Sequence, residues 1–147
     1  MRSFLFSVAP LAVALGVVGA ATAALAAMDE PFTVGDVTAV CTGVGSSKDN
    51  PAWAEYPVKL VLANNAGENL ANAHFTVTRD GKEVLKTHCG APWLLLKGPA
   101  GNYAATAMVA ETGGTTRSAS FDLASGPQKE VTLMFPTAQQ ASAQPAR

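Results

Sequence analysis

From residue 56 onward, the chain is a series of short segments in which apolar and polar residues alternate, each followed by turn residues. In residues 73–79, for example, Phe75 and Val77 share one face, while Thr76 and Thr78 share the other. Such short alternating segments, with no convincing helix between them, are typical of an antiparallel sandwich. The predicted strands are residues 56–63, 73–79, 82–88, 93–96, 103–111, 117–123 and 130–135.

Two further patterns complete the predicted fold class. Asp80-Gly81 is a strong hairpin signal, because both central positions of a type I′ turn need positive φ, and a hairpin centred there places His74 opposite Thr87. Residues 32–40 predict one more strand, and residues 49–55 predict a short helical turn with a proline at its first position. The expected fold is all-β: an antiparallel, seven-stranded sandwich with an additional N-terminal strand.

Residues 93–96 are all apolar. A strand with one exposed face would instead alternate apolar and polar residues. Either Trp93 and Leu95 or Leu94 and Leu96 face the core. An unbroken run therefore predicts a strand buried on both faces, or one whose outer face is covered by the N-terminal segment.

The first 26 residues have the pattern of a cleaved signal peptide. Arg2 precedes a long apolar run, and Ala24-Leu25-Ala26 fits the small-x-small rule for signal peptidase. We expect cleavage after Ala26, with cleavage after Ala23 or Ala27 and a retained membrane anchor as alternatives. No cysteine lies at the junction, so a lipid anchor is not expected.

Removal of this leader predicts a periplasmic or secreted protein with no membrane span. The expected organisation is a signal peptide at 1–26, an N-terminal strand and loop segment at 27–55, a sandwich core at 56–135 and a disordered tail at 136–147. The formal net charge is −1 and no basic stripe is present, so nucleic acid is not an expected partner.

The chain has two cysteines, Cys41 and Cys89, both in the part expected to be exported. An even pair in an oxidising compartment predicts a disulfide. The alternative is a metal site formed by the reduced cysteines with His88 and His74. Their spacing argues against it, because no Cys-x-x-Cys or His-x-x-x-His is present and His88 and Cys89 would face opposite sides of a strand.

The run Gly90–Tyr103, GAPWLLLKGPAGNY, resembles the glycine-proline, apolar strand and proline-x-glycine-x-tyrosine signature of carboxypeptidase regulatory-like domains. The upstream Gly43-Val44-Gly45 and the unit FTVTRDGKEVL match as well, so the resemblance covers roughly residues 40–135. It implies a transthyretin-like (prealbumin-like) sandwich that serves as an accessory or binding module, without an agreed activity. The chain departs from the pattern at Lys97-Gly98, where a leucine is usual, and in its two cysteines.

No catalytic pattern emerges from the sequence, so we expect no enzyme activity and no cofactor. There is no Gly-x-Ser-x-Gly elbow, and the two histidines lack the context found in transthyretin-like hydrolases that act on hydroxyisourate.

The expected function is a non-catalytic accessory or binding module of the cell envelope, with an envelope protein or a glycan as partner. One alternative is a carbohydrate- or peptidoglycan-binding module with Trp53, Trp93 and Tyr103 as an aromatic platform. The other is a periplasmic metal-binding protein.

Strand edges offer a route to a protein partner. If residues 82–88 or 130–135 form an exposed edge, a partner strand can pair with them. Lys82, Lys86 and Lys129 would then act as guards against self-association.

Export has a direct test. Intact-mass measurement of the protein purified from the envelope fraction should show the loss of about 26 residues from the N-terminus, because signal peptidase cleaves after a small-x-small motif. A full-length mass would contradict export by this route and favour the retained anchor.

Overall fold

The computed structural model describes residues 25–137, which form nine β-strands and three short 3-10 helices. In this part of the chain, no helix is long and apolar enough to cross a membrane. Apart from Leu25, Ala26, Pro136 and Thr137, the predicted signal peptide and the predicted tail lie outside the described residues. The elements are β1 (Pro31–Val34), β2 (Val37–Thr42), η1 (Gly45–Asp49), η2 (Pro51–Glu55), β3 (Val58–Asn64), β4 (Ala73–Arg79), β5 (Lys82–Cys89), β6 (Trp93–Lys97), β7 (Gly101–Val109), η3 (Ala110–Thr112), β8 (Thr115–Leu123) and β9 (Lys129–Phe135).

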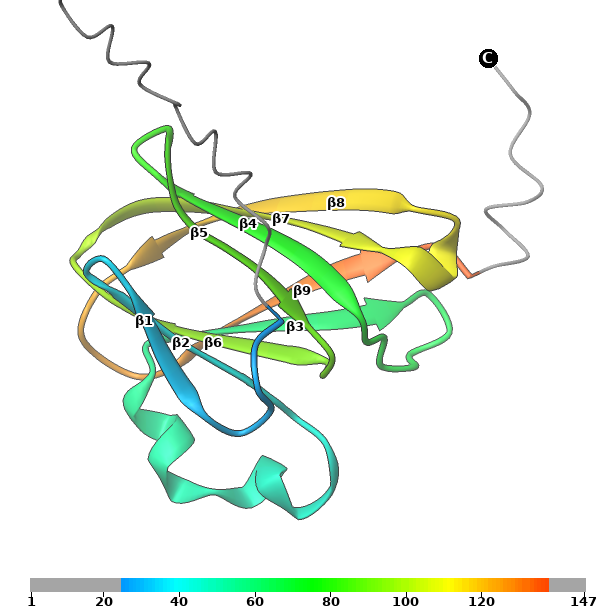
Figure 1. Cartoon of the computed structure of the whole chain (residues 1–147), viewed down its shortest axis with the longest axis horizontal. Helices are drawn as coiled ribbons and strands as arrows, with labels where there is room; N and C mark the ends of the chain where they lie inside the picture. The colour runs from blue at the N-terminus through cyan, green and yellow to red at the C-terminus, as the bar shows by residue number, and fades with distance from the viewer. Residues whose placement is uncertain (1–24, 138–147) are drawn as a thin grey trace, which may run out of the picture.

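The strands form two facing sheets, so the all-β sandwich is confirmed (Figure 1). One sheet has five strands in the order β1-β2-β6-β3-β9, and the other has four in the order β5-β4-β7-β8. Each of the seven strands expected after residue 56 is present, with ends shifted by a few residues.

The expectation of a purely antiparallel sandwich is wrong at one place. β3 and β9 run parallel, with Val58 opposite Lys129 and Asn64 opposite Phe135. Only strands joined by a short turn are forced to be antiparallel. β3 and β9 are separated by the whole sandwich, so local turn signals say nothing about their relative direction.

The single N-terminal strand expected at 32–40 is instead the hairpin β1–β2. Val34 and Val37 are paired, which leaves Gly35-Asp36 as a two-residue loop with Gly35 at φ 59°. Glycine at the first central position is the preference of a type II′ turn. Because β2 also pairs with β6, the segment at 27–55 is part of the five-stranded sheet.

The β4–β5 hairpin turns at Asp80-Gly81 as predicted, with positive φ at both residues (51° and 80°). Its predicted register is wrong by one residue beyond a β-bulge, where Val84 of β5 is an extra residue opposite the Val77–Thr78 step of β4. A bulge places an extra residue on one strand, so the pairing slips at that point. His74 therefore lies opposite His88 instead of Thr87.

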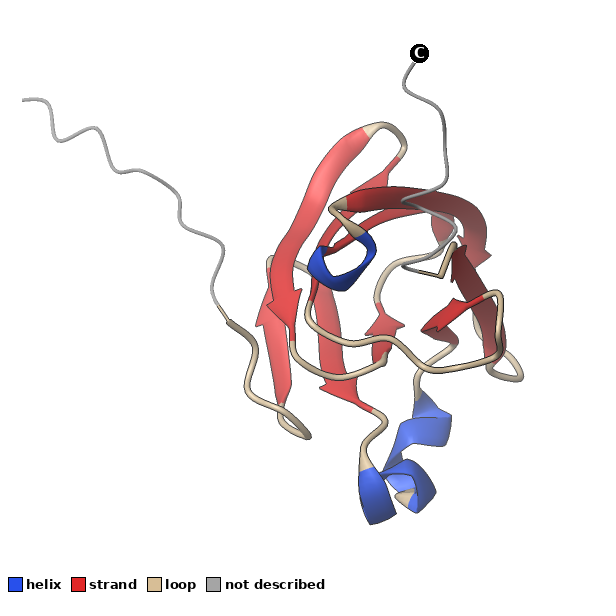
Figure 2. Cartoon of the chain, turned by 90° about the vertical axis from the view of Figure 1, so that its right-hand side faces the viewer, coloured by secondary structure: helices blue, strands red, loops and turns tan. Residues whose placement is uncertain are grey.

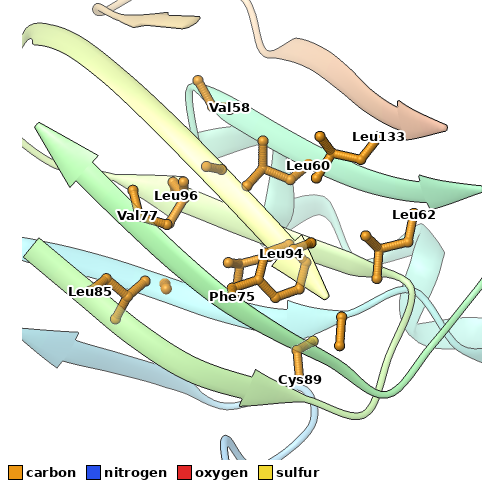
Figure 3. Close-up of a cluster of buried hydrophobic side chains, with 14 of the residues drawn as sticks. Val58, Leu60, Leu62, Phe75, Val77, Leu85, Cys89, Leu94, Leu96 and Leu133 are labelled. Atoms are coloured by element: carbon orange, nitrogen blue, oxygen red, sulfur yellow. The ribbon is translucent and has the colours of Figure 1, made fainter. Parts of the chain in front are cut away.

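Apolar side chains from both sheets fill the space between them (Figure 3). On β6, Leu94 and Leu96 point into this core, which decides between the two alternatives for the apolar run. Leu60 and Leu62 from β3 and Phe75 from β4 meet them there, all fully buried. Burying a side chain of this size contributes roughly 1.5–3 kcal/mol, so this layer supplies much of the driving force for folding.

The outer face of β6 is covered by Trp53 of η2 and by Tyr56, which follows η2. η1 and η2 project below the strands in Figure 2. Trp53 and Tyr56 pack there against Val40 and Leu95 in a second buried cluster. The predicted helical turn is present as η2, and the side chain of Asn50 caps it by accepting a hydrogen bond from the Ala52 N–H at 3.0 Å. The unbroken apolar run is therefore explained by burial on both faces.

The predicted disulfide between Cys41 and Cys89 is present, with Cα atoms 5.6 Å apart. Cys41 belongs to the five-stranded sheet and Cys89 ends β5 in the four-stranded sheet, so the bond ties the two layers together. Both cysteines are fully buried. The alternative prediction of a metal site with reduced cysteines is therefore wrong about the sulfur ligands, because neither cysteine is a free thiol.

Removing this bond should cost stability while preserving the fold. The variant with Cys41→Ala and Cys89→Ala should keep a β-rich circular dichroism spectrum and lose about 4 kcal/mol of unfolding free energy, because the bond closes a long loop in the unfolded chain. Urea unfolding followed by circular dichroism measures the loss. Thiol labelling of the unreduced native protein should find no thiol, and ready labelling of both cysteines would contradict the disulfide.

Candidate functional site

Tyr103, one member of the predicted aromatic platform, lies between the sheets. Its side chain is 2% exposed and stacks on Phe121 with ring centroids 5.9 Å apart. The hydroxyl donates a hydrogen bond to the Pro99 carbonyl at 2.7 Å, across the turn that precedes β7. Tyr103 therefore fixes this corner of the sandwich and cannot offer a face to a sugar ring.

Trp53 and Trp93 both lie on the outer side of the five-stranded sheet, in different settings. Trp53 is 7% exposed, and its indole N–H donates to the Ser47 carbonyl at 2.7 Å. The Trp93 ring lies against Gly43, where an added Cβ would come within 2.7 Å of it. Lys59 places its ammonium 4.3 Å from the centre of the same ring.

The three aromatic residues thus do not form one platform. Two of them are buried, and the third is packed under a glycine loop and a lysine that also forms a 2.8 Å ion pair with Glu130. A flat, open aromatic surface is what stacking on a sugar would need. The sequence could not distinguish these settings, because aromatic residues fit a pleated, half-buried surface of either kind.

A histidine pair lies on the outer face of the four-stranded sheet. The His74 and His88 rings stack with centroids 4.4 Å apart and planes inclined by 15°. His74 is exposed and His88 is partly buried. Burial lowers the pKa of His88 below its ordinary value, and the neighbouring His74 lowers that pKa further.

The start of the described chain lies along the edge of β5. The Ala26 N–H donates to the His88 carbonyl at 2.9 Å, and Leu25 forms a parallel bridge with His88. Beside this contact is a groove of about 200 Å³ between the N-terminal segment and β5. Its lining is mainly apolar and consists of Leu25, Ala26, Ala27, Glu30, Pro31, Phe32, Val34, Lys86 and Thr87.

A larger hollow, of about 510 Å³, lies where β3 and β9 end. Glu68 and Glu111 contribute carboxylates to its wall. The Asn64 amide donates to Glu68 at 2.8 Å, and its carbonyl oxygen accepts from the Ala66 and Glu68 N–H groups at 3.0 Å each. This polar network is closed within its own loop, so its geometry is that of a structural turn.

Among residues 25–137, no three histidine, cysteine, aspartate or glutamate side chains gather at one point. The groove at β5 and the histidine pair are the two features that sequence reasoning missed. The groove depends on the β1–β2 hairpin, and the histidine pair depends on the bulge in the β4–β5 register. A Gly-Asp pair inside the predicted 32–40 strand was the one available signal for the hairpin.

No protein-family model matches the sequence, and no curated protein matches it. Among solved structures, 5-hydroxyisourate hydrolase from Klebsiella pneumoniae is similar, with a TM-score of 0.42 and 14% sequence identity over 54% of this chain and 88% of that chain. A likeness this distant carries no activity from one protein to the other.

The lowered pKa of His88 predicts a dependence of stability on pH. Below the ordinary histidine pKa of 6.5, the unfolded chain binds a proton at this position more readily than the folded chain does. The free energy of unfolding should therefore fall as pH decreases below 6.5, until His88 is protonated in the folded state too.

Urea unfolding between about pH 5 and about pH 8 measures this dependence. In the His88→Gln variant, which cannot bind that proton, the fall in unfolding free energy should be smaller than in the unmodified protein. Equal pH dependences for the two proteins would contradict the assignment to His88.

Proposed function

We propose that this chain is a non-catalytic, exported binding module of the cell envelope that holds an extended segment of a partner protein along β5. The observation that carries the proposal is the contact between the N-terminal segment and this strand. Leu25 and Ala26 already lie against β5 in parallel, with one backbone hydrogen bond to the His88 carbonyl. The β5 edge is thus able to accept an added strand, which is a common mode of peptide recognition.

Signal cleavage after Ala26 would remove the two residues that occupy this edge. A partner segment could then take their place, with its backbone bonded to β5 and a side chain in the groove. Pro31, Phe32 and Val34 give the groove an apolar wall, and Val34 is 44% exposed. These features favour a partner segment with an apolar residue facing the groove.

The opposite edge of the sandwich is less suited to strand addition. β9 ends the five-stranded sheet, and the Arg117 guanidinium from β8 donates to the Met134 carbonyl of β9 at 3.0 Å. A side chain bonded to an edge carbonyl competes with an incoming strand. β5 carries Lys82 and Lys86, both exposed, and lysines on an edge limit uncontrolled pairing.

Two observations support the envelope location. The disulfide between Cys41 and Cys89 is typical of proteins that fold in an oxidising compartment. The leader pattern that ends at Ala26 favours export, and the resemblance to regulatory-like domains favours an accessory module.

The edge can be tested by replacing its two lysines. The protein with Lys82→Val and Lys86→Val should form dimers or larger aggregates, because β5 would then present a β-prone edge without its two lysines. Light scattering of the purified, leader-free protein measures the change. Lys48→Val is the matched control, since Lys48 is an exposed lysine in η1, and this variant should stay monomeric.

A double variant that remains as monomeric as the control would contradict strand addition at β5. Co-sedimentation of the leader-free protein with insoluble peptidoglycan tests the alternative function, a glycan-binding module. Binding to peptidoglycan, without self-association of the double variant, would favour the glycan-binding module over the one proposed here.

A further inference from the structure

Three side chains with metal-binding atoms form one row across the outer face of the four-stranded sheet. His88 on β5 lies opposite His74 on β4, and His74 lies opposite Met108 on β7. Directly opposed residues on adjacent strands have Cβ atoms about 4.5–5.5 Å apart. The row therefore places two imidazoles and a thioether on neighbouring positions of a rigid surface.

All three side chains point away from the core. Along their strands they alternate with the inward residues Cys89, Ala73 and Val109, which are fully buried. Met108 is 40% exposed, so its side chain is accessible from solvent. The histidine rings have centroids 4.4 Å apart, so a change of ring orientation can bring a nitrogen of each to one ion.

The ligand types select the ion. Two neutral imidazoles and a thioether suit a soft ion such as copper(I), whereas calcium and magnesium require oxygen ligands. No group of three histidine, cysteine, aspartate or glutamate residues competes for an ion within residues 25–137. Lys86 shares this face, and its charge repels a divalent ion more strongly than a monovalent one.

We propose that His74, His88 and Met108 form a surface site for copper(I). The two imidazole nitrogens and the Met108 sulfur bind the ion from three adjacent strands. Rotation about χ2 of each histidine, a soft torsion, turns the rings from their stacked arrangement toward a shared ion. Stacking of the two rings would explain the presence of His74 and His88 without a metal ion. It does not explain why Met108 lies beside them.

The site is independent of strand binding at β5. Strand binding uses the backbone edge of β5 and the groove, whereas the copper site uses side chains on the open face of the sheet. It also differs from a cysteine-based metal site, because both sulfurs of the disulfide are buried and bonded to each other.

A competition titration tests the site. The disulfide-bonded, leader-free protein is titrated under nitrogen with copper(I), supplied as its acetonitrile complex, against the chromophoric chelator bicinchoninate. No thiol reductant is present, so the disulfide stays intact. The expected result is one copper(I) per protein molecule, with zinc(II) binding more weakly.

Each ligand is then removed separately in His74→Gln, His88→Gln and Met108→Leu. The copper(I) dissociation constant should rise at least about tenfold in each, since loss of even an outer-shell partner of a metal ligand costs that much. Met134→Leu is the matched control, because Met134 is 45% exposed on β9 and lies outside the row, and its affinity should be unchanged. Circular dichroism of each variant verifies the fold.

Three results would overturn the proposal. The first is failure of the unmodified protein to compete with the chelator. The second is unchanged affinity in either histidine variant. The third is an equal effect of Met108→Leu and Met134→Leu, which would remove the thioether from the site. Self-association of the Lys82→Val and Lys86→Val protein tests only strand binding at β5. The copper(I) site and strand binding at β5 can therefore be contradicted independently of each other.

Discussion

The inward position of Cys89, fixed by its bond to Cys41, is the constraint on which the rest of the β5 surface depends. Successive side chains of a strand point to opposite faces, so an inward Cys89 requires an outward His88. Register then places His74 beside His88, and Met108 beside His74. A covalent bond inside the sandwich thus determines which side chains meet on its surface.

The five-stranded sheet is arranged differently, because the central part of its outer face is covered. Trp53 and Tyr56 cover Val40 and Leu95, and Lys59 lies over the Trp93 ring. Aromatic side chains here bury apolar strand surface that would otherwise face water, and the Trp53 indole N–H donates to the Ser47 carbonyl at 2.7 Å. The central strands of this sheet therefore offer little open surface, and both proposed binding sites lie on or beside the four-stranded sheet.

The sequence predicted the strands well, because each has a local signal. Period-two alternation marked β4 and β7, and Asp80-Gly81 marked the turn between β4 and β5. The disulfide was predictable from cysteine count and expected compartment. Local patterns failed wherever the answer depended on distant residues. The parallel pairing of β3 with β9 has no local signal, and neither has the bulge that brings the two histidines together.

The parallel pairing of β3 with β9 also affects the order in which the molecule can assemble. β3 is an interior strand of its sheet, yet one of its two neighbours is β9, the last strand within residues 25–137. Non-local pairings of this kind slow folding, because loop-closure entropy is lost before the contact forms. As the chain is made from its N-terminus, both cysteines precede β9. The bond between the sheets can therefore form while one side of β3 is still open, and arrival of β9 completes the five-stranded layer.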